Sequence, residues 1–170
     1  NFASCGRLIH LKNNIEIFKF INFFSNKNPN LKIFFYCVCN VKEKNELVDY
    51  AKKYFSKNIN FFLIHQVHSL TNLLKRKKIN FFLNFSYSEG MSFSVMEALS
   101  CSIPVICSKI PGNTEIINNN NGYILDKFDD KNYNLLSKKI LFDYTNKQPY
   151  FKKRRESFKS VVDKISRKKN

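Results

Sequence analysis

The sequence has little glycine, few acidic residues and no long apolar run. Only 4 of its 170 residues are glycine, below the ~7% of average usage, so each glycine marks a place where the backbone is expected to need one. Acidic residues number 13 against 29 basic ones, a net charge of +16. No apolar segment approaches the ~18 uncharged residues of a membrane-spanning helix, which excludes that class. The first residues show no secretory signal.

Length and composition predict one globular domain. A chain of 20.1 kDa with 44% hydrophobic residues can bury a core of its own. Asn1, rather than methionine, stands first. We therefore expect the sequence to be a piece of a longer chain.

The positive charge suggests nucleic acid or an anionic membrane as a partner, but it is unevenly distributed. Lysine, asparagine, isoleucine and phenylalanine are over-used together, as in AT-rich genomes. Residues 147–170 hold ten basic and two acidic residues, half of the net charge, and residues 75–78 form a second basic cluster. A charge concentrated at one end indicates a terminal helix at an anionic surface rather than a DNA-reading core. Because the aromatic residues fall mainly in expected strands, we expect them in the core and not as a platform for stacked bases.

The last segment predicts an amphipathic basic helix. Phe158, Val161, Val162 and Ile165 recur there at helical spacing. Its basic face suits anionic lipid, and a merely solvated face is the alternative.

The five cysteines predict free thiols in a reducing compartment, because their number is odd and no secretory signal is seen. Cys37 and Cys39 form C-x-C, and His65 and His68 form H-x-x-H, so zinc must be considered. The C-x-C spacing is not that of usual zinc sites, and strand alternation places both thiols on one face. Buried strand thiols are the better interpretation, and no metal is expected.

Short apolar runs alternate with polar helical stretches along the chain. We expect strands at residues 2–5, 31–38, 59–64, 79–85, 103–107 and 122–125. Helices are expected at residues 13–24, 42–55, 69–75, 92–100 and 113–118, with the remainder helical. Continuous apolar runs are typical of parallel strands covered on both faces. The repeated βα units predict an α/β fold with a doubly wound parallel sheet, whose ligands bind at the carboxyl ends of the strands.

Residues 86–99 carry the strongest functional signal. A strand ends, the loop turns through Gly90, and a helix begins near residues 92–94. The first N–H groups of such a helix are free and lie at its positive end, which favours phosphate. Glu89 and Glu97 are separated by seven residues, and their carboxylates suit sugar and ribose hydroxyls. Alternatively, Ser94 and Glu97 form a capping box, which alone would explain Glu97.

All four glycines fall near expected element ends. Gly6 follows the first strand, while Gly90 and Gly112 precede helices. Gly122 follows a run of asparagines, where a turn or a helix C-cap is the alternative to a ligand contact.

These motifs together resemble the retaining glycosyltransferases of family 4 (group 1). That family carries G-R-L…K, E-x₇-E, a P-V-[IV] strand and a G-x-x-E turn in its donor domain. The matching segments here are Gly6-Arg7-Leu8 with Lys12, Glu89-x₇-Glu97, Pro104-Val105-Ile106, Gly112-Asn113-Thr114-Glu115 and Asn121-Gly122-Tyr123. The resemblance covers roughly residues 2 to 126. It implies a Rossmann-like domain, the carboxyl-terminal, nucleotide-sugar-binding half of a GT-B fold.

The resemblance implies that Arg7, Lys12 and Glu89 are catalytic. Arg7 and Lys12 would bind the donor diphosphate, because two cations can neutralise this leaving group without a metal. Glu89 would hold hydroxyls of the donor sugar.

Further donor contacts are implied around the expected helix start. Glu97 would bind the ribose hydroxyls, and the backbone N–H groups of Ser92, Phe93 and Ser94 would face the phosphates. Glu115 is a weaker candidate, since a carboxylate in the first turn of a helix is stabilising anyway.

By resemblance the protein is a retaining hexosyltransferase that uses a UDP- or GDP-sugar and needs no cofactor or metal. The acceptor would be a glycan or a lipid-linked molecule in cell-surface polysaccharide synthesis, and nucleic acid is not an expected partner. Residues 1–146 would form the donor domain and residues 147–170 a basic terminal helix. The acceptor domain would lie outside this sequence, so the fragment alone should be inactive. A cytoplasmic location is expected, with peripheral contact at the inner face of the membrane as an extension of it.

The sequence also departs from the family pattern. Cys37-Val38-Cys39 stands where the family has Gly-x-Gly, and His65, Ser102 and Pro111 replace single glycines. Close approach of the backbone to the base is harder with side chains there. Two alternatives therefore stay open: a non-catalytic degenerate homologue that binds a partner protein, and a basic nucleic-acid-binding domain.

Overall fold

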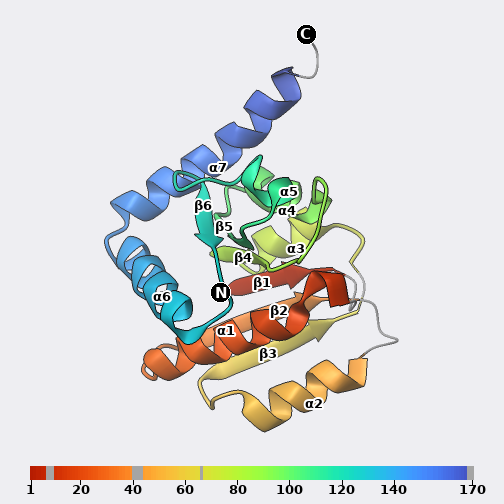
Figure 1. Ribbon diagram of the computed structural model, residues 1–170, viewed down its shortest axis with the longest axis vertical. Helices are drawn as coiled ribbons and strands as arrows, with labels where there is room; N and C mark the ends of the chain where they lie inside the picture. Colours follow the sequence, from red (N-terminus) through yellow and green to blue (C-terminus); the bar gives the residue numbers. More distant parts are fainter. Residues whose placement is uncertain (7–9, 40–43, 66, 168–170) are drawn as a thin grey trace.

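The computed structural model describes residues 1–6, 10–39, 44–65 and 67–167, and it contains one parallel sheet with helices on both faces (Figure 1). The strands are β1 (Phe2–Cys5), β2 (Ile33–Val38), β3 (Ile59–Ile64), β4 (Phe81–Asn84), β5 (Val105–Ser108) and β6 (Gly122–Leu125). The helices are η1 (His10–Lys12), α1 (Asn14–Lys27), α2 (Lys44–Tyr54), α3 (Leu70–Arg76), α4 (Phe93–Ser100), α5 (Pro111–Thr114), α6 (Asp130–Thr145) and α7 (Gln148–Arg167).

The predicted doubly wound sheet is confirmed. The strand order is β3-β2-β1-β4-β5-β6, and each neighbouring pair is parallel. The chain adds strands outward in one direction from β1 to β3 and then returns to the other side of β1 with β4. In such sheets the crevice for ligands opens at the carboxyl ends of the two strands where the order reverses, here β1 and β4.

Two apolar layers explain why the strand sequences are continuous apolar runs. Phe2 and Phe35 face a core with α1, α2 and α6, in which Phe18 and Phe20 are fully buried. Residues on the opposite side of the sheet pack with α3, α4 and α7, as Ala3 does. Burial on both faces removes the polar alternation that a half-exposed strand would show.

The bounds predicted for the helix at residues 113–118 are wrong. The helix there is α5, Pro111–Thr114, which begins earlier because proline fits the first helical position. It ends early because the side chain of Asn121 replaces helical hydrogen bonds: its Oδ1 accepts from the Asn118 N–H and its Nδ2 donates to the Ile116 carbonyl, both at 2.8 Å. The other predicted strands and helices are present, with ends shifted by up to three residues, and the remainder, expected to be helical, forms α6 and α7 from Asp130 onward.

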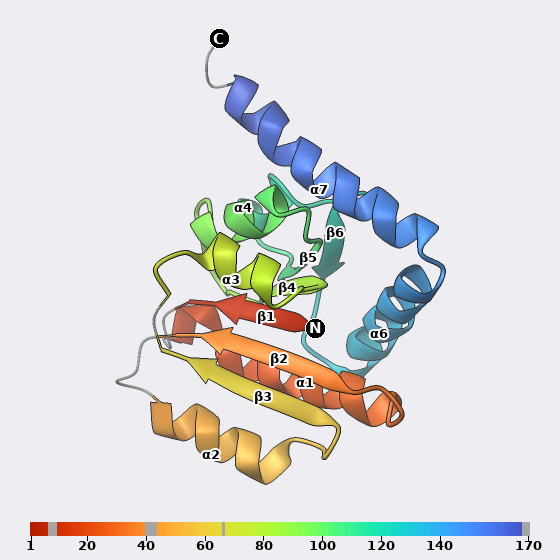
Figure 2. The ribbon, with the colours of Figure 1, turned by 180° about the vertical axis from the view of Figure 1, so that it is seen from behind.

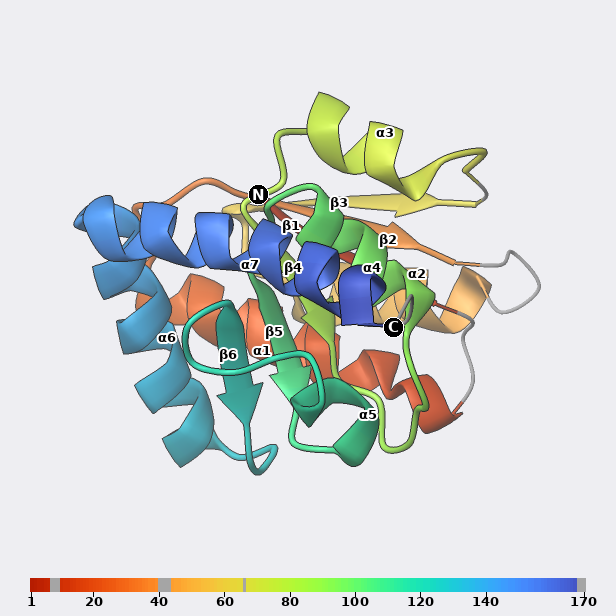
Figure 3. The same ribbon diagram turned by 90° about the horizontal axis from the view of Figure 1, so that it is seen from above.

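Helix α7 is basic and amphipathic, but its buried face agrees with the predicted one only at Val161. It lies across α4 (Figure 3). Its buried residues are Tyr150, Lys153, Ser157 and Val161, whereas Phe158 and Val162 are exposed. A buried polar cluster around Lys153, rather than an apolar stripe alone, therefore orients this helix.

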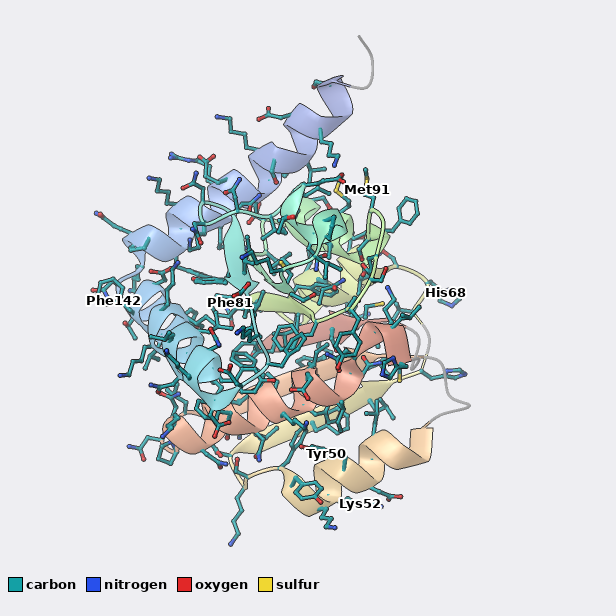
Figure 4. All side chains as sticks on the ribbon, viewed as in Figure 1. Tyr50, Lys52, His68, Phe81, Met91 and Phe142 are labelled. Carbon is teal, nitrogen blue, oxygen red and sulfur yellow. The ribbon has the colours of Figure 1, made fainter. Side chains whose placement is uncertain are left out.

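The expected location of the aromatic residues is correct only in part. Phe18, Phe20 and Phe35 are fully buried, but Phe93 and Phe142 are among several that are exposed. The side chain of Phe142 points outward at the left of the molecule (Figure 4). Within the described ranges, no helix is long and apolar enough to cross a membrane.

Candidate functional site

The candidate site is built from segments that follow the carboxyl ends of β1 and β4. These are η1 after β1, the loop of residues 85–92 after β4, and the beginning of α4. The Tyr87 N–H donates to the Leu11 carbonyl (2.9 Å), which joins the loop to η1. Two segments about 75 residues apart in the sequence are thereby held side by side, as the doubly wound topology requires.

Glu89 is the centre of a polar network. Its carboxylate forms an ion pair with the Lys12 ammonium. Oε1 also accepts from Ser86 Oγ (3.0 Å), and Oε2 accepts from Asn84 Nδ2 (3.2 Å). The Glu89 side chain is only 6% exposed. A buried carboxylate with three partners has a fixed orientation before any ligand arrives, as a binding group requires.

Ser92 and Ser94 lie next to this network at the beginning of α4. Ser92 is the N-cap, but its side chain makes no capping hydrogen bond. Its Oγ instead accepts from Asn84 Nδ2 (3.3 Å) and shares a hydrogen bond with Ser94 Oγ (3.1 Å). In the described part of the chain no side chain caps the first-turn N–H groups of α4, so its positive end remains available to an anion.

The capping-box alternative for Glu97 is wrong. Because α4 begins at Phe93 after the N-cap Ser92, Ser94 is its second residue and Glu97 its fifth. Glu97 lies half-buried and close to Cys5 at the end of β1. Burial, followed by the charge of Glu97, raises the pKa of the Cys5 thiol to about 11, and the Lys12 charge opposes that shift. Lys12, Glu89 and Glu97 therefore converge on the ends of β1 and β4.

The remaining predicted site residues contribute less from their side chains. The Phe93 side chain is 83% exposed at the beginning of α4, and the group predicted for the site is its backbone N–H. Arg7 lies outside the described residues. Glu115 is exposed and pairs with Lys164 (3.6 Å) on α7. It does not join the Glu89 network.

The glycines differ in what they do for the site. A Cβ added at Gly112 would lie 2.0 Å from the carbonyl oxygen of Gly90 and 2.2 Å from that of Glu89. Helix α5 therefore packs directly on the backbone of the Glu89 loop, and only glycine fits. At Gly90 a Cβ would meet nothing within 4 Å, and its φ is not positive. The expectation that the backbone needs glycine at every glycine position is wrong for Gly90.

Sequence reasoning missed the polar residues at the strand ends that hold Glu89 and its loop in place. Asn84 is buried at the end of β4 and donates to both Glu89 and Ser92. Ser108, at the end of β5, donates to the Ser86 carbonyl (2.5 Å), and its own carbonyl accepts from Asn113 Nδ2 (3.0 Å). The signal available was a single polar residue at the end of each of these two apolar strands, Asn84 and Ser108.

The histidines and cysteines do not form a metal centre among the described residues, where no three His, Cys, Asp or Glu side chains could hold an ion. His10 stacks on Tyr87, with ring centroids 5.2 Å apart. His68 points away from the protein (Figure 4). Cys37 and Cys39 are buried and form no disulfide, as expected.

Three described thiols, those of Cys5, Cys37 and Cys107, have raised pKa values and are therefore poorly suited to act as nucleophiles at neutral pH. A hydrogen bond with Cys39, in which the Cys37 thiol donates, and burial raise the pKa of Cys37, and burial raises that of Cys107 to about 12. The thiolate is the reactive form, and it is scarce at such values. Covalent catalysis by these three thiols is therefore not expected.

Residues 2–158 match the sequence model of a family described as "Glycosyl transferases group 1". No curated protein matches the chain. Solved structures share its fold. One is S. aureus TarM in complex with fondaparinux, alpha-GlcNAc-glycerol and UDP, with a TM-score of 0.78 and 20% identity over 96% of this chain and 32% of TarM.

Two further structures show the same likeness. The C-terminal domain of LpcC from Francisella tularensis gives a TM-score of 0.70 and 18% identity, covering 96% of this chain and 85% of that one. Anabaena HepE in complex with UDP gives 0.74 and 14%, covering 95% and 43%. The six-stranded parallel sheet is thus that of C-terminal GT-B domains. The chain spans about a third of the length of TarM.

Proposed function

Because the chain belongs to the glycosyl transferases of group 1, we propose that it binds the nucleoside diphosphate sugar from which a glycosyltransferase transfers its sugar. The observation that carries the proposal is the buried Glu89 carboxylate. It is held by Lys12, Asn84 and Ser86 beside the uncapped beginning of α4. A carboxylate for hydroxyls next to a cation and a helix N-terminus for phosphates is the pair of subsites that such a donor needs.

In the proposed reaction these groups bind the two ends of the breaking bond. Glu89 accepts hydrogen bonds from hydroxyls of the donor sugar and fixes its orientation. Lys12, Arg7 and the N–H groups of Ser92, Phe93 and Ser94 stabilise the diphosphate as negative charge develops on it. Glu97 accepts hydrogen bonds from the ribose hydroxyls. No metal or cofactor takes part in this proposal.

The finer assignment follows the family 4 resemblance. We propose transfer of a hexose with retention to a glycan or a lipid-linked acceptor, in polysaccharide synthesis. The donor domain would comprise residues 1–146, and the acceptor domain would lie in a part of the protein outside this sequence. A uridine donor is favoured over guanosine because TarM and HepE were crystallised with UDP.

A thermal-shift screen with UDP, GDP and ADP and their sugars tests the proposal. At 100 times its Kd, a ligand that binds only the folded state adds ~2.7 kcal/mol. For a domain of this size the Tm should rise by roughly 5–11 °C, with UDP giving the largest shift. No shift with any nucleotide would favour the degenerate homologue.

A separate measurement tests the nucleic-acid alternative. Binding of duplex DNA with a Kd tighter than micromolar at physiological salt would favour it.

A further inference from the structure

β3 is an unprotected edge of the sheet. It pairs with β2 along its whole length, and in the described ranges no strand lies on its other side. All six of its residues are at least partly exposed, whereas those of β4 and β5 are all buried. The sequence of β3, INFFLI, has no charged residue and no proline. Proteins usually protect such edges with charges or proline, because the free backbone groups can pair with another chain.

A row of stacked groups lies on the α3 side of β2 and β3, where Tyr36 is buried and Phe62 is exposed. Seen from behind, these two strands have no helix over them (Figure 2). Phe62, which is 42% exposed, stacks between Phe34 (6.4 Å) and Tyr36 (4.8 Å). The Lys32 ammonium lies over the Phe34 ring and the Lys77 ammonium over the Tyr36 ring, each 5.5 Å from the centroid.

This row favours anions over flat aromatic ligands. The ring faces are occupied by one another and by the two ammonium groups, so neither a base nor a sugar ring has a free face on which to stack. The groups that remain accessible are ring edges, which carry positive partial charge, and the ammonium groups of Lys32 and Lys77. Carboxylates complement both.

The charge around the edge strand is predominantly positive. Residues 17–88 contain twelve lysines and arginines and three acidic residues, all three within residues 43–49 in or just before α2. The parts of this segment that supply β2, β3, α3 and β4 contain no aspartate or glutamate. A second copy of the chain would bring like charge to this surface, whereas an acidic partner would be attracted.

We propose that β3 binds an acidic segment of another protein, which adds to the sheet as an extended strand. Main-chain hydrogen bonds to the free edge of β3 would supply affinity, and alternate side chains would supply selectivity. Carboxylates of the segment lie near Lys32 and Lys77, and its apolar side chains lie against Phe62. The surface is two strands away from β1. The partner can therefore bind without occupying the Glu89 site.

A labelled ten-residue peptide of alternating glutamate and valine is a suitable probe, measured by fluorescence anisotropy with the 170-residue chain at low salt. The matched control is the same peptide with methyl groups on its four central amide nitrogens, which keeps its charge but removes donors from both of its edges. We expect the methylated peptide to bind about 10-fold more weakly or worse, since it loses net hydrogen bonds. Equal affinity, or no binding of either peptide, would overturn the proposal. Binding of phosphatidylglycerol vesicles with no binding of peptide would overturn it in favour of lipid.

Two serine variants locate the peptide on the surface. Phe62→Ser should raise the Kd of the unmethylated peptide about 10-fold, because the apolar side chains of the peptide then have no ring to cover. Phe151→Ser removes a ring on α7 that is more exposed than that of Phe62 (59% against 42%) and should leave the Kd unchanged. Melting curves verify that both variants are folded. An equal effect of the two substitutions would place the peptide elsewhere and contradict the assignment.

Discussion

Replacing Asp143 by alanine is expected to lower the free energy of unfolding by about 3–5 kcal/mol, because it leaves a buried ammonium without its counter-charge. Asp143 on α6 and Lys153 on α7 are both buried, with Oδ2 and Nζ 4.0 Å apart. The same Oδ2 accepts from the Tyr123 hydroxyl (2.8 Å). Lys153 also donates to the Asn119 carbonyl and lies over the Tyr123 ring. Burial lowers the pKa of Lys153, which shows that its charge is already costly there.

Asp126→Ala is the matched control for this prediction. Asp126 and Lys109 lie closer together, at 3.0 Å, but both are exposed. Loss of such a pair should cost less than about 1 kcal/mol. The double variant Asp143→Ala/Lys153→Met should recover much of the loss, since no unpaired charge remains buried. Urea unfolding measures all three. Equal small effects at positions 126 and 143 would show that the buried pair does not anchor α7.

The Gly112→Ala substitution should lower the free energy of unfolding by about 3 kcal/mol, at the upper end of overpacking costs. The added Cβ would collide with the carbonyl oxygens of Glu89 and Gly90, which are backbone atoms and cannot rotate away. For a domain of this size the Tm should fall by roughly 6–12 °C. The displaced loop carries Glu89, so affinity for UDP should fall as well.

Gly90→Ala is the matched control, because it adds the same methyl group at a neighbouring glycine that has space for it. A Cβ at Gly90 meets no atom within 4 Å, and the backbone there has no positive φ. We expect its Tm to stay within about 2 °C of the parent, a change of at most ~1 kcal/mol. Differential scanning fluorimetry compares the two variants directly. A Gly112→Ala variant as stable as Gly90→Ala would show that α5 does not need to contact the loop.

The fold could be predicted from the sequence because strands buried on both faces are continuous apolar runs, which are easily recognised. Strands such as β2 are apolar along their whole length, which identifies a parallel sheet. The end of α5 could not be predicted, since the side chain of Asn121 competes with helical hydrogen bonds in a way that no propensity describes. The buried face of α7 was also missed, except for Val161. Its position depends on Asp143 and Tyr123, which are distant in sequence.

The candidate site was predictable where its motif is local. The spacing of Glu89 and Glu97 located the loop and helix, and the structure brings Lys12 to Glu89. The sequence did not reveal which residues orient the Glu89 carboxylate. Asn84 and Ser86 donate to it only because the loop after β4 folds back toward them. Glycine scarcity located Gly112 correctly and overvalued Gly90. In this chain glycine is required at Gly112, where backbone atoms occupy the space that a Cβ would fill, and not at Gly90, where that space is empty.

Titration of UDP by calorimetry into the parent, Glu97→Gln and Glu115→Gln tests the central claim most directly. Both substitutions remove one negative charge without changing shape. Glu97 lies half-buried near Cys5 at the end of β1, whereas Glu115 is exposed and paired with Lys164. Hydrogen bonds to a charged group contribute about 1.5–3 kcal/mol, so the Kd for UDP should rise roughly 10- to 100-fold in Glu97→Gln. It should change less than about twofold in Glu115→Gln. Unchanged affinity in Glu97→Gln, or an equal loss in both variants, would contradict a donor site at the ends of β1 and β4.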